Sequence, residues 1–377
     1  MTYTASSIHP TIAEINLQAF QQNIRELKKR LHKTKLLAVV KTNAYGHGLL
    51  EVSKAAVAAG ADQLGVTSVE AGTLLRNHGI KIPIQLLSTI LSEQAAAVVA
   101  NDLTAAVFTE KLARKLSGEA VLQNKTVSAH LKIDTGLHRF GIAPETAQSF
   151  CEHCYHLPHL KWEGIYTHFS SADEGDWVTT EQQYTVFIDT IARLRQSGYT
   201  FSLHHAGGST IAIERSDMHL DMVRPGIALF GYHPAHRQHS MIELKPVMKL
   251  TTNIIHIMEL PANTPVGYGG NYLTKGAEKL AILPIGHGDG YKRALSNKGE
   301  VLINSQRAKI VGTISLDQTV IDITDIPHVY EGDEVVLIGK MGDEKITAQE
   351  IANWLESIVD EVVSSLMERI TRKYIHS

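Results

Sequence analysis

The sequence predicts an α/β protein with an N-terminal (β/α)8 barrel, or TIM barrel, followed by a β-rich C-terminal domain. Two observations predict the barrel: strand-like and helix-like patterns alternate up to about residue 240, and chemically useful side chains follow the strands. A third observation predicts the second domain, because short β segments replace the alternation beyond that point. A doubly wound parallel sheet is the structural alternative for the first part.

Eight apolar segments of the first part have the Val, Ile and Leu content of buried parallel strands. They are residues 36–41, 63–68, 83–88, 104–108, 128–133, 162–168, 201–206 and 222–231. Helical periodicity occurs between them, at residues 49–59, 69–77, 93–100, 110–116, 144–155, 180–196 and 210–215. A strand at 11–17 and a helix that begins near Phe20 precede the first barrel strand. In a barrel of this kind, the chemistry is expected at the carboxyl ends of the strands.

The second part of the chain has a different sequence pattern, without the alternation of strands and helices. Short strands are predicted at residues 248–257, 279–284, 300–303, 309–314, 319–323 and 334–338, and one long helix at 348–366. A chain of 377 residues is long enough for two hydrophobic cores. We therefore expect two domains, a barrel over residues 1–240 and a β-strand domain over residues 241–377.

Composition argues against several classes of partner and site. A formal net charge of −3 gives no nucleic-acid footprint. No apolar run approaches the ~20 residues that span a bilayer, and the first residues lack the pattern of a secretion signal. Only two cysteines occur, Cys151 and Cys154, which favours a reducing cytoplasm. Their C-x-x-C spacing is more typical of one helix face than of a redox or metal site, so no metal is expected.

The first chemical signal is Lys41, at the end of the buried strand 36–41. Burial disfavours the charged ammonium form, and a lysine with a lowered pKa is a nucleophile suited to a Schiff base with an aldehyde cofactor. The alternative is a strand-end lysine whose ammonium group reaches water. The segment continues Asn-Ala-Tyr-Gly-His-Gly, with Tyr45, Gly46 and Gly48, which favours the first interpretation.

The second signal is the segment 224–227, Arg-Pro-Gly-Ile, which interrupts an apolar strand. Together with Gly-Gly-Ser at 207–209, it would offer backbone N–H groups to a phosphate at the place where barrels favour one. The alternative is a turn at the barrel rim, with Arg224 in an ion pair. As a cofactor residue, Arg224 would donate to an unprotonated ring nitrogen and keep it so, because arginine retains its proton.

Three further segments carry candidate residues. In segment 131–141, a strand with Lys132 leads into a glycine turn that presents Arg139, whose guanidinium group suits a carboxylate or a phenolate. A solvated ion pair at a surface turn is the alternative. His168 ends a strand and would stack on a cofactor ring, or is simply a core histidine. Tyr268 lies between glycines, a pattern that alone indicates a turn.

Together these motifs resemble the alanine racemases, a PLP-dependent family of fold type III, in order and spacing over essentially the whole chain. The resemblance implies a cytoplasmic isomerase that interconverts L- and D-alanine with pyridoxal 5′-phosphate (PLP) and supplies D-alanine for peptidoglycan. It also implies a homodimer with active sites at the subunit interface. In that family the lysine matching Lys41 and the tyrosine matching Tyr268 are the two catalytic bases.

The resemblance also implies binding roles. The cofactor-binding residues would be Lys41, Tyr45, His168, Gly208, Ser209, Arg224, Gly226 and Ile227. The substrate-binding residues would be Arg139, Leu316 and Asp317. Lys132 matches a lysine that is often carbamylated in that family.

Several positions depart from the family pattern, among them Thr42, where alanine is usual, and Ala-Gly-Gly-Ser at 206–209, where Ala-Asn-Ser is usual. His287, Thr313, Leu316 and Glu368 stand where the family usually has tyrosine, arginine, methionine and tyrosine. A changed entrance allows a broader specificity for serine, lysine or ornithine, since pockets discriminate only modestly between apolar groups. The resemblance also leaves room for a PLP-dependent amino-acid decarboxylase or a non-catalytic PLP-binding homologue. The decarboxylases usually carry a cysteine in the C-terminal domain, which this chain lacks.

Overall fold

The structure, a computed structural model, describes residues 9–376. Contacts divide these residues into two units. The barrel unit comprises residues 19–44 and 49–245. The β unit comprises the described residues up to 18, the short segment 45–48 and the residues from 246 onward. The expected domain boundary at residues 240 and 241 stays a prediction, and the sequence pattern did not indicate that the first strand and residues 45–48 pack with the second half.

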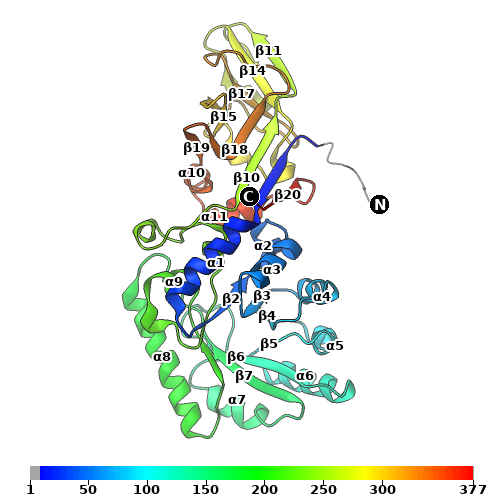
Figure 1. The fold of residues 1–377 in the computed structure, drawn as a ribbon, viewed down its shortest axis with the longest axis vertical. Coiled ribbons are helices and arrows are strands. Elements are labelled where there is room, and N and C mark those ends of the chain that lie inside the picture. Colours follow the sequence, from blue (N-terminus) through cyan, green and yellow to red (C-terminus); the bar gives the residue numbers. More distant parts are fainter. Residues whose placement is uncertain (1–8, 377) are drawn as a thin grey trace. The chain divides into compact units, whose positions relative to one another are not determined.

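The barrel unit contains eight parallel strands in two four-stranded sheets, and most of these strands can be found by their labels in Figure 1. They are β2 (Lys35–Val39), β3 (Gln63–Val66), β4 (Ile84–Leu86), β5 (Ala105–Val107), β6 (Val127–Lys132), β7 (Leu160–Tyr166), β8 (Leu203–His205) and β9 (Met222–Val223). The first of these strands pairs with the last, and an isolated bridge between Gln85 and Thr104 joins β4 to β5. Backbone hydrogen bonds such as Asp221 N–H to the His204 oxygen join β8 to β9. The predicted barrel is therefore confirmed.

Helices follow the barrel strands. They are α3 (Leu49–Ala58), α4 (Val69–Asn77), α5 (Ala95–Ala100), α6 (Glu110–Leu122), α7 (Ala147–Cys154), α8 (Trp177–Gln196) and α9 (Ser209–Glu214), preceded by α1 (Leu17–Leu31). Side chains fix several starting points: Ser68, Thr109 and Asp176 each accept a backbone N–H of the first turn of α4, α6 and α8. Such caps satisfy donors that have no partner within the helix.

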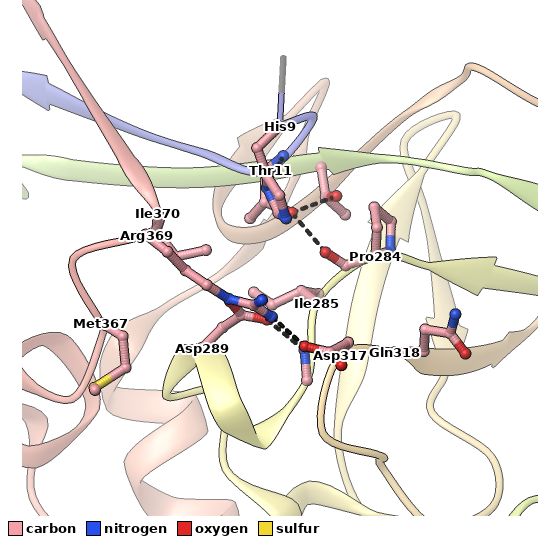
Figure 2. Close-up of polar contacts among 12 residues, drawn as sticks. His9, Thr11, Pro284, Ile285, Asp289, Asp317, Gln318, Met367, Arg369 and Ile370 are labelled. Carbon is pink, nitrogen blue, oxygen red and sulfur yellow. Dashed lines mark hydrogen bonds and ion pairs between the residues drawn. The ribbon is translucent and has the colours of Figure 1, made fainter. Parts of the chain in front are cut away.

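The β unit is built from three sheets. The largest has the order β16-β15-β18-β10-β1-β20, with β19 paired to β18; β11-β14-β17 and β12-β13 form the others. The strands are β1 (Ile12–Asn16), β10 (Met248–Asn253), β11 (His256–Leu260), β12 (Pro265–Val266), β13 (Tyr272–Leu273), β14 (Glu278–Leu283), β15 (Glu300–Ile303), β16 (Gln306–Lys309), β17 (Thr319–Asp322), β18 (Glu334–Met341), β19 (Glu344–Ile346) and β20 (Thr371–Ile375). Just before β1, the Thr11 hydroxyl contacts the Thr252 hydroxyl and donates to the Pro284 oxygen (Figure 2).

Four predicted segments differ most clearly from the structure, and one of them, the predicted strand 248–257, is divided between β10 and β11. The predicted strand 222–231 is only two residues long, because Pro225 lacks an N–H and the chain turns into the 3-10 helix η3 (Ile227–Phe230). The predicted helix 348–366 is two helices, α10 (Ala348–Trp354) and α11 (Val359–Ser364). The predicted strand 309–314 begins and ends earlier, as β16.

Candidate active site

Lys41 follows β2 and begins a left-handed turn, α2 (Lys41–Tyr45). The next three residues have φ angles of 54°, 50° and 52°, in the left-handed region. Each non-glycine residue costs about 1–2 kcal/mol there, and such strain is found mainly at functional sites. The side chain of Asn43 helps to hold the turn, because its Oδ1 accepts the Leu49 N–H at 2.7 Å. The strand itself ends at Val39, so this strained turn, rather than the strand, carries Lys41.

Arg224 is buried in the barrel unit among neutral acceptors. Its Nη1 donates to Nδ1 of His205 at 2.8 Å, and its Nη2 lies 3.0 Å from Nδ1 of His168. Nη2 also donates to the backbone oxygens of Thr167 and Ala206, both at 2.8 Å. No carboxylate of the described residues pairs with this guanidinium group. Burial therefore lowers the pKa of Arg224 to about 10.

Lys132 ends β6 beside the same cluster. It is buried, and its Nζ lies 4.9 Å from the ring centroid of Tyr166. Burial, and then the charge of Arg224, lowers the pKa of Lys132 well below its usual value. The Tyr166 ring in turn stacks on His205, with centroids 4.8 Å apart and planes at 2°. Arg139 is exposed, and its charge is a smaller contribution to the lowered pKa of Lys132.

Ser209 joins the segments that follow β8 and β9. Its hydroxyl oxygen accepts the backbone N–H groups of Gly226 at 3.0 Å and Ala228 at 3.3 Å. Ser209 begins α9, directly after Gly208, and Ile227 begins η3. A hydroxyl group and backbone N–H groups from two segments therefore gather after the last two barrel strands, where barrels commonly bind phosphate.

Residues 45–48 belong to the β unit, and their glycines have a packing role there. A Cβ at Gly46 would lie 2.1 Å from the backbone oxygen of Val363, and a Cβ at Gly48 would lie 1.9 Å from the hydroxyl of Tyr374. Both glycines also have positive φ angles. Tyr45, next to them, is buried. The glycines that attracted attention in the sequence are thus required by the approach of the C-terminal segments.

Tyr268 is the most exposed large hydrophobic side chain among the described residues of the β unit, with 74% of its surface accessible. It begins the short 3-10 segment η5 (Tyr268–Gly270), whose neighbour Gly267 has a φ of 72°. The hydroxyl of Thr313 donates to the backbone oxygen of Tyr268 at 3.0 Å, and Asn271 Nδ2 donates to that hydroxyl at 3.0 Å. The backbone of Tyr268 is therefore held while its ring projects from the unit.

Asp317 is held by Arg369. Nη2 of Arg369 lies 2.5 Å from Oδ1 of Asp317 and 2.8 Å from Oδ2 of Asp289, and its Nε also pairs with Asp289 (Figure 2). Asp289 is fully buried. The hydrogen bonds to Asp289 and then Asp317 raise the pKa of Arg369 above its usual value. The backbone N–H of Gly288 also donates to the Leu316 oxygen. Two contacts thus fix the turn that carries Leu316 and Asp317.

The structure brings together only some of the predicted site residues. Within the barrel unit lie Lys41, Lys132, Arg139, His168, Gly208, Ser209, Arg224, Gly226 and Ile227; within the β unit lie Tyr45, Tyr268, Leu316 and Asp317. Among the departures from the family pattern, His287 and Glu368 are exposed in the β unit, and Thr313 is buried beneath Tyr268.

Sequence reasoning missed several residues of these clusters. His130 is one, although its alternation with Lys132 in the same strand was a usable signal. His205 and Tyr166 are others, and their contacts with Arg224 depend on the closure of the barrel. Arg369 and Asp289 are separated by 80 positions, and no local pattern connects them.

The two cysteines are buried free thiols. Burial raises the pKa of Cys151 to about 12 and that of Cys154 to about 11, above the values typical of reactive thiols. No group of three or more potential metal ligands is found in residues 9–376. Within the same range, every helix is too short or too polar to cross a membrane.

The fold and these residues define a two-domain barrel enzyme. Two family models account for most of the chain: the alanine racemase N-terminal domain matches residues 15–234, and the alanine racemase C-terminal domain matches residues 247–374. The chain therefore belongs to the alanine racemase family.

Relatives and solved structures agree. The alanine racemase of Halothermothrix orenii is 40% identical over 366 residues, 97% of each chain. That of Methanococcus maripaludis is 39% identical over 371 residues, 98% of this chain and 99% of the relative. The alanine racemase structure from Bacillus anthracis with bound L-Ala-P has a TM-score of 0.92 at 31% identity, covering 99% and 97% of the two chains. The Bartonella henselae enzyme with covalently bound pyridoxal phosphate has a TM-score of 0.88 at 28% identity, covering 97% and 99%. Neither broader specificity nor a non-catalytic role is favoured by these matches.

Proposed function

We propose that this chain interconverts L- and D-alanine with PLP as its cofactor, using Lys41 and Tyr268 as its two bases. Family membership over the whole chain supports the reaction. The observation that carries the cofactor proposal is Arg224, a buried cation whose partners are all neutral. A pyridine nitrogen without a proton is an acceptor that fits such a donor, since arginine does not release its own proton.

The residues of the barrel unit fit the other parts of PLP. The amine of Lys41 would hold the aldehyde carbon. The Ser209 hydroxyl, whose oxygen accepts the backbone N–H groups of Gly226 and Ala228, would donate its proton to the phosphate. When bound, PLP supplies an electron sink for the negative charge that develops at the substrate Cα. The complete proposed cofactor-binding set is Lys41, Tyr45, His168, Gly208, Ser209, Arg224, Gly226 and Ile227.

The substrate is an amino acid, and its carboxylate needs a cationic partner. Arg139 is exposed and without a carboxylate partner among the described residues, so its guanidinium group is available for that role. If the neutral amine of Lys132 adds to carbon dioxide and releases a proton, the carbamate formed would place an anion beside this arginine and orient it. The low pKa of Lys132 supports this step, because only the neutral amine is nucleophilic. Leu316 and Asp317 remain proposed substrate contacts.

Racemisation requires one group to remove the Cα proton and another to return a proton to the opposite face. Lys41 would act on one face through Nζ. Tyr268 would act on the other through its hydroxyl, which projects from the β unit and has no hydrogen-bond partner among the described residues. We infer a homodimer in which Tyr268 of the partner subunit completes each site. The D-alanine formed is a peptidoglycan precursor, and the proposed compartment is the cytoplasm.

Mixing two inactive variants tests this proposal. Lys41→Ala and Tyr268→Ala are each expected to lose more than about 99% of the activity. When their subunits exchange, one of the two sites in each heterodimer keeps both bases, so activity should return. The matched control mixes Lys41→Ala with itself under the same conditions. Verified heterodimers without activity would contradict the shared site.

A further inference from the structure

One layer of the barrel interior holds three polar side chains, Gln85, His130 and His205, which have no direct part in the proposed reaction. Parallel pairing runs from His130 on β6 to Gly164 on β7 and on to Leu203 on β8. Nevertheless, the His130 ring bonds to His205, two residues beyond that partner. A Cβ at Gly164 would lie 2.6 Å from Nδ1 of His130, so the glycine makes room for this contact. Strand tilt therefore shifts a layer by two residues for every two strands.

The same shift places Gln85 in the layer of His130. His130 pairs with Ala106 on β5, while the bridge between β5 and β4 joins Thr104 to Gln85. Two strands before β6, on β4, the residue in the layer of His130 is therefore Gln85. Two strands after β6, on β8, it is His205. All three side chains of the layer are fully buried.

Proton positions in this layer follow from Arg224, which can only donate. Nη1 of Arg224 donates to Nδ1 of His205 at 2.8 Å, so that nitrogen carries no proton. Burial lowers the pKa of His205 well below its usual value, and its single proton must therefore be on Nε2. Nε2 lies 2.8 Å from Nδ1 of His130 and donates to it. Burial lowers the pKa of His130 to about 3, so this ring is also neutral and carries its proton on Nε2.

The chain of donors then reaches two groups without partners. Nε2 of His130 has no hydrogen-bond partner among the described residues, and neither atom of the Gln85 amide has one. Exchanging the amide oxygen and nitrogen changes nothing, because both are unpartnered. Buried polar groups in native proteins are nearly always bonded to protein or to ordered water. The Nε2–H donor of His130 and the amide oxygen of Gln85 lie in the same layer of the barrel. The first lacks an acceptor and the second lacks a donor.

We propose that one bound water joins Nε2–H of His130 to the amide of Gln85, and that these two residues are positioning residues for Arg224. The relay runs from Arg224 through His205 and His130 to the water and Gln85. Each hydrogen bond in such a chain polarises the next, so an acceptor at its end strengthens the hold on Nη1 of Arg224. The Nε–H of Arg224 has no acceptor among the described residues and is left for a ring nitrogen. The catalytic part of this inference rests on the proposed function.

The relay itself is tested without any turnover. Long-range proton–nitrogen NMR of enzyme labelled with 15N-histidine, assigned with His130→Asn and His205→Asn, should show both rings neutral with the proton on Nε2 from about pH 5 to 9. In Gln85→Leu, the Nε2–H signal of His130 should shift and exchange faster with solvent. The matched control is Gln63→Leu, a buried glutamine whose Oε1 is also unpartnered but which lies on β3, outside the set of alternate strands β4, β6 and β8 that form the layer. A protonated ring, the Nδ1–H form, or an unchanged His130 signal in Gln85→Leu overturns the relay.

Two further readouts follow from the same pair of variants. If Gln85 were truly without a partner, replacing it by leucine would raise the melting temperature; the bound water predicts a fall instead. In enzyme loaded with PLP, Gln85→Leu should lower kcat about tenfold with KM within about twofold, while Gln63→Leu leaves both within about twofold. Gln85→Glu, which is neutral when buried and keeps an acceptor oxygen, should recover most of kcat. Equal kinetic effects of the two leucine variants overturn the positioning role. A wild-type enzyme without racemase activity would refute the proposed function, and the NMR test would still decide the relay.

Discussion

Two arginines of this chain, one in each unit, are used in opposite ways. Arg224 is buried among neutral acceptors, and burial lowers its pKa to about 10. Arg369 is half exposed and binds two carboxylates, which raise its pKa (Figure 2). The charge of Arg369 is neutralised by carboxylates of the fold, whereas the charge of Arg224 has no carboxylate partner among the described residues and is available for the proposed ligand. Around Arg224, burial lowers the pKa values of His130, His205 and Lys132. Around Arg369, the ion pairs with Asp289 and Asp317 hold a turn in place.

The largest expected effect concerns the neutral histidines beside Arg224. His130, His168 and His205 all have lowered pKa values, so the unfolded chain takes up three more protons than the folded one once pH falls below about 6.5. Stability is therefore present above that pH and is lost as pH falls toward the folded-state pKa of His130, about 3. The expected slope from these three groups is about 4 kcal/mol per pH unit. Urea unfolding of the wild type and of His130→Leu between pH 7.5 and 5 measures it. The variant should lose about a third of the slope, and identical slopes would contradict the assignment.

A smaller effect is expected when the charge of Arg224 is removed. Arg224→Gln keeps a donor but no cation, and should lower kcat about a hundredfold, or about 3 kcal/mol in the barrier, while cofactor binding persists. Steady-state kinetics with D- and L-alanine, together with an absorbance titration of PLP, separate the two quantities. Activity within threefold of wild type would show that the buried cation is not required.

Breaking the other arginine should affect stability rather than chemistry. Arg369→Leu leaves the buried carboxylate of Asp289 with only the backbone N–H of Gly286, and should cost about 2–3 kcal/mol of unfolding free energy. Asp317→Asn removes only a solvent-exposed pair and should cost less than about 1 kcal/mol. Denaturant titration of both variants compares them. If both variants lost the same unfolding free energy, the burial of Asp289 would not explain the stability that Arg369 provides.

The smallest effect is a steric test of the layer beneath Arg224. Gly164→Ala places a methyl group 2.6 Å from His130 Nδ1 and should cost about 1–3 kcal/mol of stability. Its control is Gly118→Ala in α6, where nothing lies within 4 Å and alanine should stabilise the helix by up to about 1 kcal/mol. Melting temperatures that move in the same direction would contradict the close contact.

Much of the fold was predictable because burial leaves a clear pattern in a parallel barrel. All eight barrel strands occur where apolar runs predicted them, and the helix 69–77 agrees at both ends. The left-handed turn after β2 was not predictable, since its non-glycine residues carry no signal for positive φ angles. The break in the predicted helix 348–366 was missed because apolar residues continue on both sides of it.

The site was predictable where one residue type has one chemical use, as for Lys41 and Arg224. The site was not predictable where a contact forms only because the barrel closes or because two segments far apart in the sequence meet. The layer of Gln85 and His130 requires the strand shift, and the Arg369 pair requires segments far apart in the chain to meet. The roles of Lys41, Tyr268 and the proposed ligand contacts stay predictions until they are measured.

The most direct test of the account is polarimetry of the purified, PLP-loaded protein with L-alanine, accompanied by borohydride reduction and peptide mapping. The account predicts that the optical rotation decays to zero as the mixture becomes racemic, that Lys41→Ala abolishes the decay, and that the reduced cofactor is found on Lys41. A constant rotation with the cofactor on Lys41 would contradict racemase activity, and a label on Lys132 would contradict the assignment of the catalytic lysine.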